Sequence, residues 1–258
     1  MHHNELIPLE QLNEETYGHV ICYPKYDVKE LRKRLKELKK LGVTAVEFSG
    51  KKVVSNLSVL GKGCVGIVVM AYKKDERIAM KIRRIDADRT KMQHEAEMLK
   101  KANTVNIGPN LLAISDNFLI MELIEGTLLP EWINTSKGKG TKSRIKRVLQ
   151  AVLEQSWSLD ELGVDHGELS RAPKHIIIDA NEKPCIVDYE TASANRKVSN
   201  VTSICQYFFI GSQIAKTIRK KIGKIDRTKL IQALRNYKQK RTREIFEKIL
   251  RICTLHNV

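Results

Sequence analysis

The sequence predicts an α+β fold in which a β-rich lobe precedes a mainly helical lobe. Short β-prone segments between glycine and polar turns dominate residues 45–125, whereas helical periodicity dominates residues 126–258. An amphipathic pattern comes before both, so residues 1–44 are interpreted as an N-terminal extension. A chain of 258 residues is long enough to bury a core in each of two lobes.

The composition is that of a globular protein. Hydrophobic residues make up 42% of the chain and charged residues 29%, and no apolar run reaches the roughly 18 residues of a membrane span. Residues 1–5 lack the pattern of a signal peptide, so we expect a cytoplasmic protein without a membrane partner. The cysteines form no Cys-x-x-Cys pair, which indicates reduced, mostly buried thiols: Cys22, Cys64, Cys185, Cys205 and Cys253.

The N-terminal extension contains one well-defined helix. Asp27 is a typical N-cap and Gly42 a typical C-cap, and apolar residues recur between them at helical spacing, with lysines and arginines in between. These apolar positions are Val28, Leu31, Leu35, Leu38 and Leu41. We expect this helix to pack its apolar side against the rest of the protein.

The β-rich lobe is predicted from β-prone runs that are bounded by turn residues, with one helix over residues 91–103. The expected strands are residues 43–54, 57–60, 67–72, 77–82 and 117–124. In the helical lobe, a long amphipathic helix is predicted over 143–162, after a loop at 136–140. Two short strands, at 175–178 and 185–187, precede a region that is helical from about residue 201.

A turn in the β-rich lobe matches the pattern G-x-G-x-x-G-x-V of a phosphate-binding loop. Its glycines let the backbone pass close to phosphates, so that N–H groups can face them. An ordinary hairpin could contain the same turn, but a dinucleotide-binding fold is disfavoured because a strand follows it. The predicted ATP contacts here are Gly61, Lys62, Gly63, Cys64, Val65, Gly66 and Val68.

The next strand ends in Ile-Ala-Met-Lys, close to the V-A-I-K pattern in which a lysine holds the α- and β-phosphates. We therefore expect Lys81 and Ala79 to contact ATP. In the following helix, Glu95 is predicted to pair with Lys81, because helical spacing directs Glu97 toward solvent. A surface lysine and an exposed glutamate are the ordinary alternatives.

An apolar strand that runs into acidic residues and Gly126 is typical of a hinge between two lobes. Backbone groups of Glu122 and Ile124, with Leu123 between them, would bond the edge of adenine. An ordinary core strand is the alternative interpretation.

The order of these motifs resembles that of protein kinases, over roughly residues 55–215. The short chain and the segment 93–99 (QHEAEML) are most similar to small atypical kinases of archaea, which include the RIO family and the kinase subunit of the KEOPS complex. The resemblance implies a bilobal protein-kinase-like fold, with an N-lobe at 45–125 and a C-lobe at 126–258 that lacks a long activation segment. It also implies ATP and Mg²⁺ or Mn²⁺ as cofactors.

The catalytic loop departs from the kinase pattern at its acid. Small kinases carry His-Gly-Asp-Leu, whereas this sequence has His-Gly-Glu-Leu, which ends at Leu169. The resemblance therefore implies that Glu168 accepts the proton of the substrate hydroxyl or orients that hydroxyl. Its carboxylate is one methylene longer than that of aspartate, and a misplacement near 1 Å can cost roughly a hundredfold in rate.

The metal ligands also differ. The pattern expects an asparagine where Pro173 stands, so we infer a two-residue insertion that places His175 at the ligand position. Imidazole suits softer metals than magnesium, and a His175 that bonds Glu168 or a phosphate, or that is only structural, stays open. Asp188 occupies the place of the metal-binding aspartate of Asp-Phe-Gly, and Glu190 replaces the glycine and could add a second carboxylate.

The charge distribution indicates polyanionic partners. The formal net charge is +16, and between Lys216 and Arg243 twelve lysines and arginines accompany one acid, Asp226. A docking surface for RNA, the ribosome or an acidic protein and a solvated helical face both fit this pattern. Tyr237 is the one aromatic residue in the segment, so a stacking platform for bases is not expected.

Two functions follow from the resemblance. The first is an ATP-dependent serine/threonine protein kinase in which Lys81, Glu168 and Asp188 are catalytic and whose protein substrate is unknown. The second is a pseudokinase or slow ATPase that acts as a nucleotide-gated switch for RNA, ribosome or protein binding, which the departures in the catalytic loop favour. A small-molecule kinase of the aminoglycoside or choline type shares the His-Gly-Asp signature, but no long insertion supplies an acceptor pocket.

Overall fold

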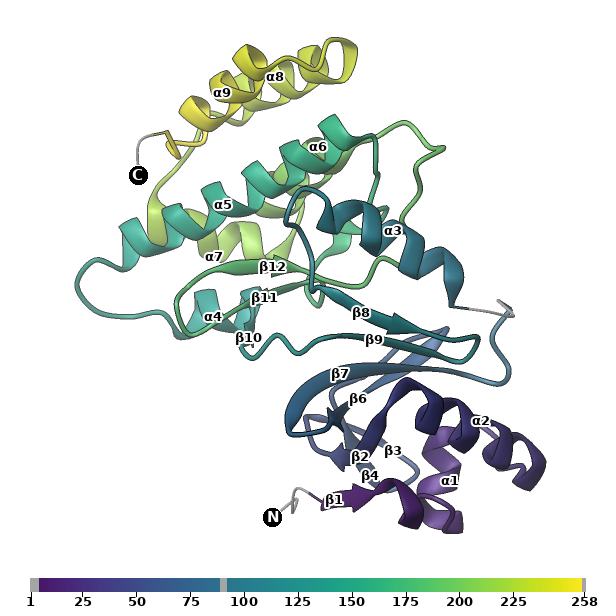
Figure 1. The fold of residues 1–258 in the computed structure, drawn as a ribbon. Coiled ribbons are helices and arrows are strands. Elements are labelled where there is room, and N and C mark those ends of the chain that lie inside the picture. Colours follow the sequence, from purple (N-terminus) through teal and green to yellow (C-terminus); the bar gives the residue numbers. More distant parts are fainter. Residues whose placement is uncertain (1–4, 89–91, 257–258) are drawn as a thin grey trace. The chain divides into compact units, whose positions relative to one another are not determined.

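The computed structural model describes residues 5–88 and 92–256 and has an α+β architecture (Figure 1). The chain divides into two units: unit 1 contains residues 1–100 and 109–123, and unit 2 contains residues 101–108 and 124–258. Unit 1 is rich in strands and unit 2 is mainly helical, as the sequence predicts. The helix predicted over 91–103 is α3 (Gln93–Asn103), and Lys91 lies outside the described residues.

Unit 1 is built on an antiparallel sheet of seven strands in the order β1-β2-β6-β7-β9-β8, with β5 paired to β6. A separate hairpin joins β3 to β4, and the segment predicted as one strand over residues 43–54 is divided into β2 and β3 at residues 49–51. The strands are β1 (Glu5–Pro8), β2 (Val43–Phe48), β3 (Lys52–Val54), β4 (Leu57–Val59), β5 (Gly61–Lys62), β6 (Gly66–Lys73), β7 (Glu76–Arg83), β8 (Leu111–Ile114) and β9 (Phe118–Glu122).

The two faces of this sheet bury different residues, because successive side chains of a strand point to opposite faces. One face packs on α1 (Glu15–Ile21) and α2 (Val28–Leu41) in the main apolar cluster of the unit. That cluster includes Val20, Leu31, Leu38, Ile67, Val69, Ile78, Met80, Ile82 and Ile120. On the other face, Leu119 of β9 packs with Met92 and with Ala96 of α3.

The predicted N-terminal helix is present as α2. The Asp27 carboxylate accepts a hydrogen bond from the Glu30 N–H (2.7 Å), and Gly42 ends the helix at φ 77°. The predicted apolar side is wrong at Val28, which is 46% exposed because it lies in the first turn, beyond the edge of the sheet cluster. Arg34 is fully buried instead and donates to the carbonyls of Ile21 and Arg83.

Unit 2 surrounds a long helix, α5, with shorter helices and a small sheet. The antiparallel strands β10 (Thr127–Leu128), β11 (Ile176–Ile178) and β12 (Pro184–Ile186) form this sheet. The helices are α4 (Leu129–Thr135), α5 (Thr141–Leu162), α6 (Asn200–Cys205), α7 (Gln213–Ile222), α8 (Arg227–Gln239) and α9 (Arg243–Ile252), with a π-helical turn η3 (Gln206–Ile210) after α6. In the helical hairpin at the end of the chain, α8 packs against α9 (Figure 1).

Two 3-10 turns complete the described elements: η1 (Leu9–Gln11) in unit 1 and η2 (Leu169–Arg171) in unit 2. Within residues 5–88 and 92–256, every helix is too short or too polar to span a bilayer. The cysteines are free thiols, of which Cys22, Cys205 and Cys253 are buried and Cys64 is exposed, so the prediction of mostly buried thiols is confirmed.

Candidate functional site

The predicted pair of Lys81 and Glu95 is present in unit 1. The Lys81 Nζ lies 2.9 Å from Glu95 Oε1 and 2.8 Å from Glu95 Oε2, and each side chain is 5% exposed. Glu97 is exposed, as the helical spacing predicts. A buried ion pair with this geometry holds both side chains in one position, because moving either would leave a charge without compensation.

Sheet register brings the predicted ATP contacts near Lys81. Val68 is opposite Lys81 in the β6–β7 pair, and Gly61 is opposite Val68, so these positions share one face of the sheet. Ala79 shares that face because it lies two residues before Lys81 on β7. A Cβ at Gly66 would lie 3.0 Å from the Lys81 Cγ, so glycine here lets the lysine side chain pass close to β6.

The glycine-rich turn between β5 and β6 is closed by its own backbone. The Gly63 N–H donates to the Gly66 carbonyl (2.8 Å), and the Arg84 N–H donates to the Val65 carbonyl (2.8 Å). Cys64 is exposed at this turn. Lys62 lies over the ring of Tyr23, with its Nζ 4.7 Å from the ring centroid. We call the turn (residues 61–66), Lys81 and Glu95 the lysine site.

The predicted hinge lies at the passage from unit 1 to unit 2, because unit 1 ends its second segment at Leu123 and unit 2 resumes at Ile124. The Glu122 N–H donates to the Asn110 carbonyl (2.9 Å), and the Glu122 carboxylate accepts from the Asn110 side-chain amide (2.8 Å). An adenine at this strand would therefore have to bond the Glu122 carbonyl rather than its N–H.

In unit 2, an ion pair supports the predicted catalytic loop (residues 165–169). The Asp165 carboxylate accepts from the Arg196 Nε (2.6 Å) and from the Ser199 N–H (2.9 Å). Gly167 has φ 89°, and a Cβ there would lie 2.5 Å from the Arg196 Nη2 and 2.9 Å from the Thr191 Oγ1. Glycine is therefore required at this position for two reasons, its backbone conformation and the close approach of the following segment.

A buried polar network supports the same loop. The Asn200 side chain accepts from the His166 N–H (2.9 Å) and donates to Asp160 (2.9 Å) and to the Val164 carbonyl (2.7 Å). Asp160 also accepts from the Tyr237 hydroxyl (3.0 Å). Burial raises the pKa of Asp160, and the hydrogen bonds from Asn200 act in the opposite direction.

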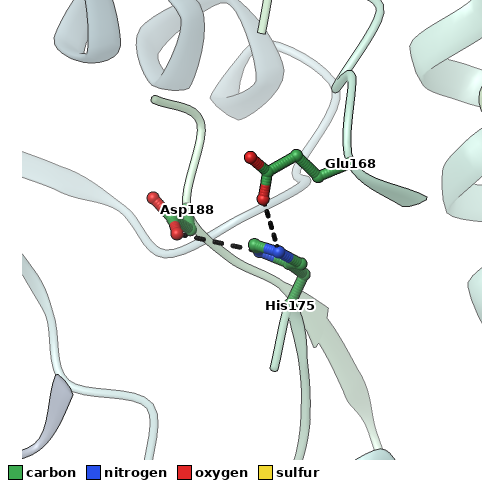
Figure 2. Close-up of side chains that lie close together, drawn as sticks. All are labelled: Glu168, His175 and Asp188. Atoms are coloured by element: carbon green, nitrogen blue, oxygen red, sulfur yellow. Dashed lines mark ion pairs between the residues drawn. The ribbon is translucent and has the colours of Figure 1, made fainter. Parts of the chain in front are cut away.

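Glu168, His175 and Asp188 lie together in unit 2, with the imidazole between the two carboxylates (Figure 2). The His175 Nε2 is 2.6 Å from Glu168 Oε2, and its Nδ1 is 3.7 Å from Asp188 Oδ2. Because an ionised carboxylate only accepts, the shorter contact is a hydrogen bond that Nε2–H donates to Glu168. We call these three residues the histidine site.

The β11–β12 hairpin positions two members of this site. His175 immediately precedes β11 and Asp188 follows β12, and the Val187 N–H donates to the His175 carbonyl (3.0 Å). Asp188 has φ 72°, a conformation that costs a non-glycine residue about 1–3 kcal/mol. Such local strain is typical of functional positions, since the surrounding structure must hold it in place.

A second histidine, His166, lies beside His175, with the two ring centroids 5.6 Å apart. His166 is fully buried, and its Nε2 is 3.1 Å from the Val187 carbonyl. Burial, and after it the nearby His175, lowers the pKa of His166 to about 4. His166 is therefore neutral at pH 7 and donates its Nε2–H to Val187. Tyr189, in the place of the phenylalanine of Asp-Phe-Gly, is also buried, and burial raises its pKa.

The donor set of the histidine site fits a divalent cation. Each of its three residues offers one ligand atom, and these atoms lie within 4.8 Å of one another. Two ligands of one ion, each at about 2.1 Å, lie roughly 3.0–3.6 Å apart, close to the separation of His175 Nδ1 from Asp188. The contact of His175 Nε2 with Glu168 is shorter than that range, so Glu168 orients the imidazole as an outer hydrogen-bond acceptor.

Sequence reasoning did not find the residues that support the predicted catalytic loop: Asp160, Asp165, Arg196 and Asn200. One signal was available for Asp160. It follows Leu153 and Ser156 at helical spacing on the side of α5 that is buried, and an acid on a buried helix face needs a partner. The partner itself, Asn200, is 40 residues away in the chain, and no local pattern marks it.

The fold and the two sites define an α+β protein that has a buried lysine–glutamate pair in unit 1 and a histidine–carboxylate cluster in unit 2. No family model matches the chain. It is 32% identical over 113 residues to the uncharacterized protein MJ1211 of Methanocaldococcus jannaschii, a match that covers 43% of this chain and 92% of that protein. The chain belongs to the same family as this archaeal protein, and that kinship assigns no activity.

Proposed function

We propose that this protein is an ATP-dependent phosphotransferase of the serine/threonine protein kinase type. The observation that carries the proposal is the buried ion pair of Lys81 and Glu95 on the face of the sheet that also bears the glycine-rich turn. A desolvated, fixed ammonium group beside a glycine turn is a site for phosphates, because a point charge and backbone N–H groups both favour anions. The proposal includes the bilobal protein-kinase-like fold that the sequence resemblance implies.

In this proposal, Glu168 and His175 act on the substrate hydroxyl. His175 holds one oxygen of the Glu168 carboxylate, and the other oxygen accepts the hydroxyl proton. The hydroxyl oxygen attacks the γ-phosphorus, the bond from that phosphorus to the β–γ bridging oxygen breaks, and ADP leaves. The hydrogen bond to His175 orients the longer side chain of glutamate and so compensates for the extra methylene.

Asp188 and the Nδ1 of His175 would hold the metal ion. A divalent cation there would neutralise negative charge on the β- and γ-phosphates. The imidazole favours Mn²⁺ over Mg²⁺, because nitrogen ligands suit transition metals and Mg²⁺ prefers oxygen. The predicted ATP contacts in the glycine turn, Ala79 and the backbone from Glu122 to Ile124 belong to the same proposal.

A second candidate function is a pseudokinase or slow ATPase that switches partner binding. It is favoured by the departures from the kinase pattern at Glu168, Pro173, His175 and Glu190. This candidate predicts ATP binding without transfer to any protein.

Transfer of the labelled γ-phosphate of ATP to the protein itself or to a generic acceptor tests the proposal. With Mn²⁺, Asp188→Ala is expected to lower transfer by about a thousandfold or more, since the metal-bridged phosphates lose their anchor. Asp75→Ala, at an exposed turn residue of unit 1, is the control and should keep full transfer. Equal transfer by Asp188→Ala would contradict the kinase assignment, and calorimetric ATP binding without transfer under either metal would favour the switch.

A further inference from the structure

The proposed function leaves unused a groove in unit 2, between α8 and the continuous segment of α6 and η3. Its volume is about 280 Å³. One wall presents residues at helical spacing along α6 and η3, and the other presents residues at the same spacing along α8. The lining residues are Ser199, Thr202, Ser203, Gln206 and Ile210 on the first wall and Ile231, Leu234, Arg235 and Lys238 on the second.

Hydrogen bonds at both ends of α8 define its direction. Arg227, the first residue of α8, donates to the carbonyls of Phe209 and Ile210, the last two residues of η3. Tyr237, near the end of α8, donates to Asp160 (3.0 Å), which also accepts from the N–H of Asn200 at the start of α6 (2.9 Å). The helix α8 therefore runs antiparallel to α6 and η3.

The antiparallel arrangement gives the groove two chemically different ends. Three hydroxyl groups and two cations meet at one end, and apolar side chains meet at the other. The polar end contains Ser199, Thr202, Ser203, Arg235 and Lys238, and the apolar end contains Ile210 and Ile231. Ile231 is 38% exposed, so its side chain is accessible to a ligand in the groove.

The cations at the polar end have no counter-charge in the groove. Arg235 and Lys238 are three positions apart on one helix, a spacing at which like charges repel. Both are exposed, and neither has an acidic partner among the described residues. Two acids that contact residues of α6 and α8 are engaged elsewhere: Asp160 accepts from Asn200 and Tyr237, and Asp165 accepts from Arg196 and Ser199. An anionic ligand would relieve this repulsion.

We propose that the groove binds an acidic peptide segment of a partner protein. Carboxylates would bind at Arg235 and Lys238, and an apolar side chain would bind at Ile231. Ile231 and Lys238 are seven positions apart, a separation of about 10 Å along the helix. An extended peptide covers that distance in about three residues, so the expected ligand carries its acidic and apolar side chains two or three positions apart.

The chemistry of the groove favours a peptide over a nucleic acid. Its lining residues include no aromatic side chain on which a base could stack, and its apolar end suits an aliphatic side chain rather than a phosphate backbone. The hydroxyl groups of Ser199 and Thr202 already donate within the protein, to Asp165 and to the Ser199 carbonyl, and neutral groups add little of the electrostatic attraction on which nucleic-acid binding depends.

A hydrogen bond links the polar end of the groove to the loop that carries Glu168. The Ser199 hydroxyl donates to the Asp165 carboxylate (3.1 Å), and Asp165 opens the loop that carries Glu168. We therefore assign the groove to the protein substrate, an assignment that rests on the proposed function. Peptide binding itself does not depend on that function, so the two are tested separately.

Fluorescence anisotropy of a labelled peptide, without nucleotide or metal, tests the groove. The peptide carries two adjacent aspartates and a leucine three positions later, and a matched peptide has asparagines in place of the aspartates. We expect the acidic peptide to bind at least tenfold more tightly than the neutral one. The charge reversal Arg235→Glu with Lys238→Glu should weaken its binding by about tenfold or more, since two attractive contacts become repulsive.

The control reversal, Lys240→Glu with Lys248→Glu, changes the net charge equally at exposed positions outside the groove lining and should leave binding within twofold. Ile231→Ala should weaken binding severalfold without changing the preference for aspartate. Equal losses in both charge reversals, or displacement of the peptide by single-stranded RNA that binds the groove more tightly, would overturn the proposal. Absence of phosphate transfer with intact peptide binding would contradict the kinase assignment and leave the groove established.

Discussion

The lysine site and the histidine site are positioned by different kinds of structure. Lys81 lies in a strand with partners on both sides, and its register against Val68 and Leu119 fixes the face on which its side chain emerges. The histidine site depends on loops, and its supporting contacts come from residues such as Asn200 and Arg196 that are far away in the chain. The comparison shows that a sheet transmits local sequence patterns directly into geometry, whereas a loop takes its geometry from long-range hydrogen bonds.

The largest expected effect tests the rigidity of the lysine site. Lys81→Ala removes the ammonium group that pairs with the buried Glu95 carboxylate, and this is expected to cost about 3–5 kcal/mol of the free energy of unfolding. Urea unfolding at pH 7 measures the loss. Lys52→Ala, at an exposed lysine of β3, is the control and should change stability by less than about 0.5 kcal/mol. A loss below about 1 kcal/mol for Lys81→Ala would mean that the pair does not fix the site.

The second effect is the pH dependence of stability that arises from the buried His166 beside the histidine site. The pKa of His166 is lowered from 6.5 to about 4, so between these values the unfolded chain binds a proton that the folded chain does not. Stability should therefore decrease as pH falls from 6.5 toward 4, and His166 should contribute at most about 3 kcal/mol of that decrease.

The measurement is the free energy of unfolding in urea at several pH values in this window. His166→Asn removes the titrating group and should flatten the pH dependence, whereas His19→Asn, at a histidine with 41% of its side chain exposed, should follow the wild type. Identical slopes for wild type and His166→Asn would show that His166 takes up its proton in the folded state as readily as in the unfolded chain.

The smallest expected effect is a difference in stability between alanine substitutions at two glycines of the same turn. A Cβ at Gly66 would lie 3.0 Å from the Ile82 carbonyl oxygen and 3.0 Å from the Lys81 Cγ, whereas a Cβ at Gly61 would meet Val68 at an ordinary 3.5 Å. Gly66→Ala should therefore cost about 1–3 kcal/mol, and Gly61→Ala less than about 0.5 kcal/mol. Thermal unfolding of both variants measures the difference, and equal stability would show that the lysine side chain can move aside.

Much of the fold follows from local patterns. The β-rich and helical parts and the capped helix from Val28 to Leu41 were predictable, because each depends on spacing within a strand or helix. The pair of Lys81 with Glu95 was predictable from the order of motifs that resembles protein kinases. The burial of Arg34 was not predictable, because it depends on acceptors from three separate segments. The alternation of charged and apolar residues in α2 suggested an exposed position instead.

The histidine site was predictable in its members but not in its bonding. The sequence proposed Glu168, His175 and Asp188 and left open whether His175 bonds a metal, a phosphate or Glu168. The structure has the bond from His175 to Glu168, at 2.6 Å. Which residue the imidazole contacts depends on the path of the loop between His166 and Ile176. The hairpin register of Ile176 with Ile186 fixes one end of that loop, and the hydrogen bond from the His166 N–H to the distant Asn200 fixes the other.

Cys64 gives the glycine-rich turn a reactive group of its own. In the part of the chain that the structure describes, Cys64 has the one exposed thiol. Burial raises the pKa of the Cys22 and Cys205 thiols, which makes them slow to react. A maleimide dye or nitroxide would therefore attach fastest at Cys64, ahead of the half-buried Cys185, in the unaltered protein. The turn that is proposed to cover the phosphates thus carries a natural labelling position, from which nucleotide occupancy can be followed by spectroscopy.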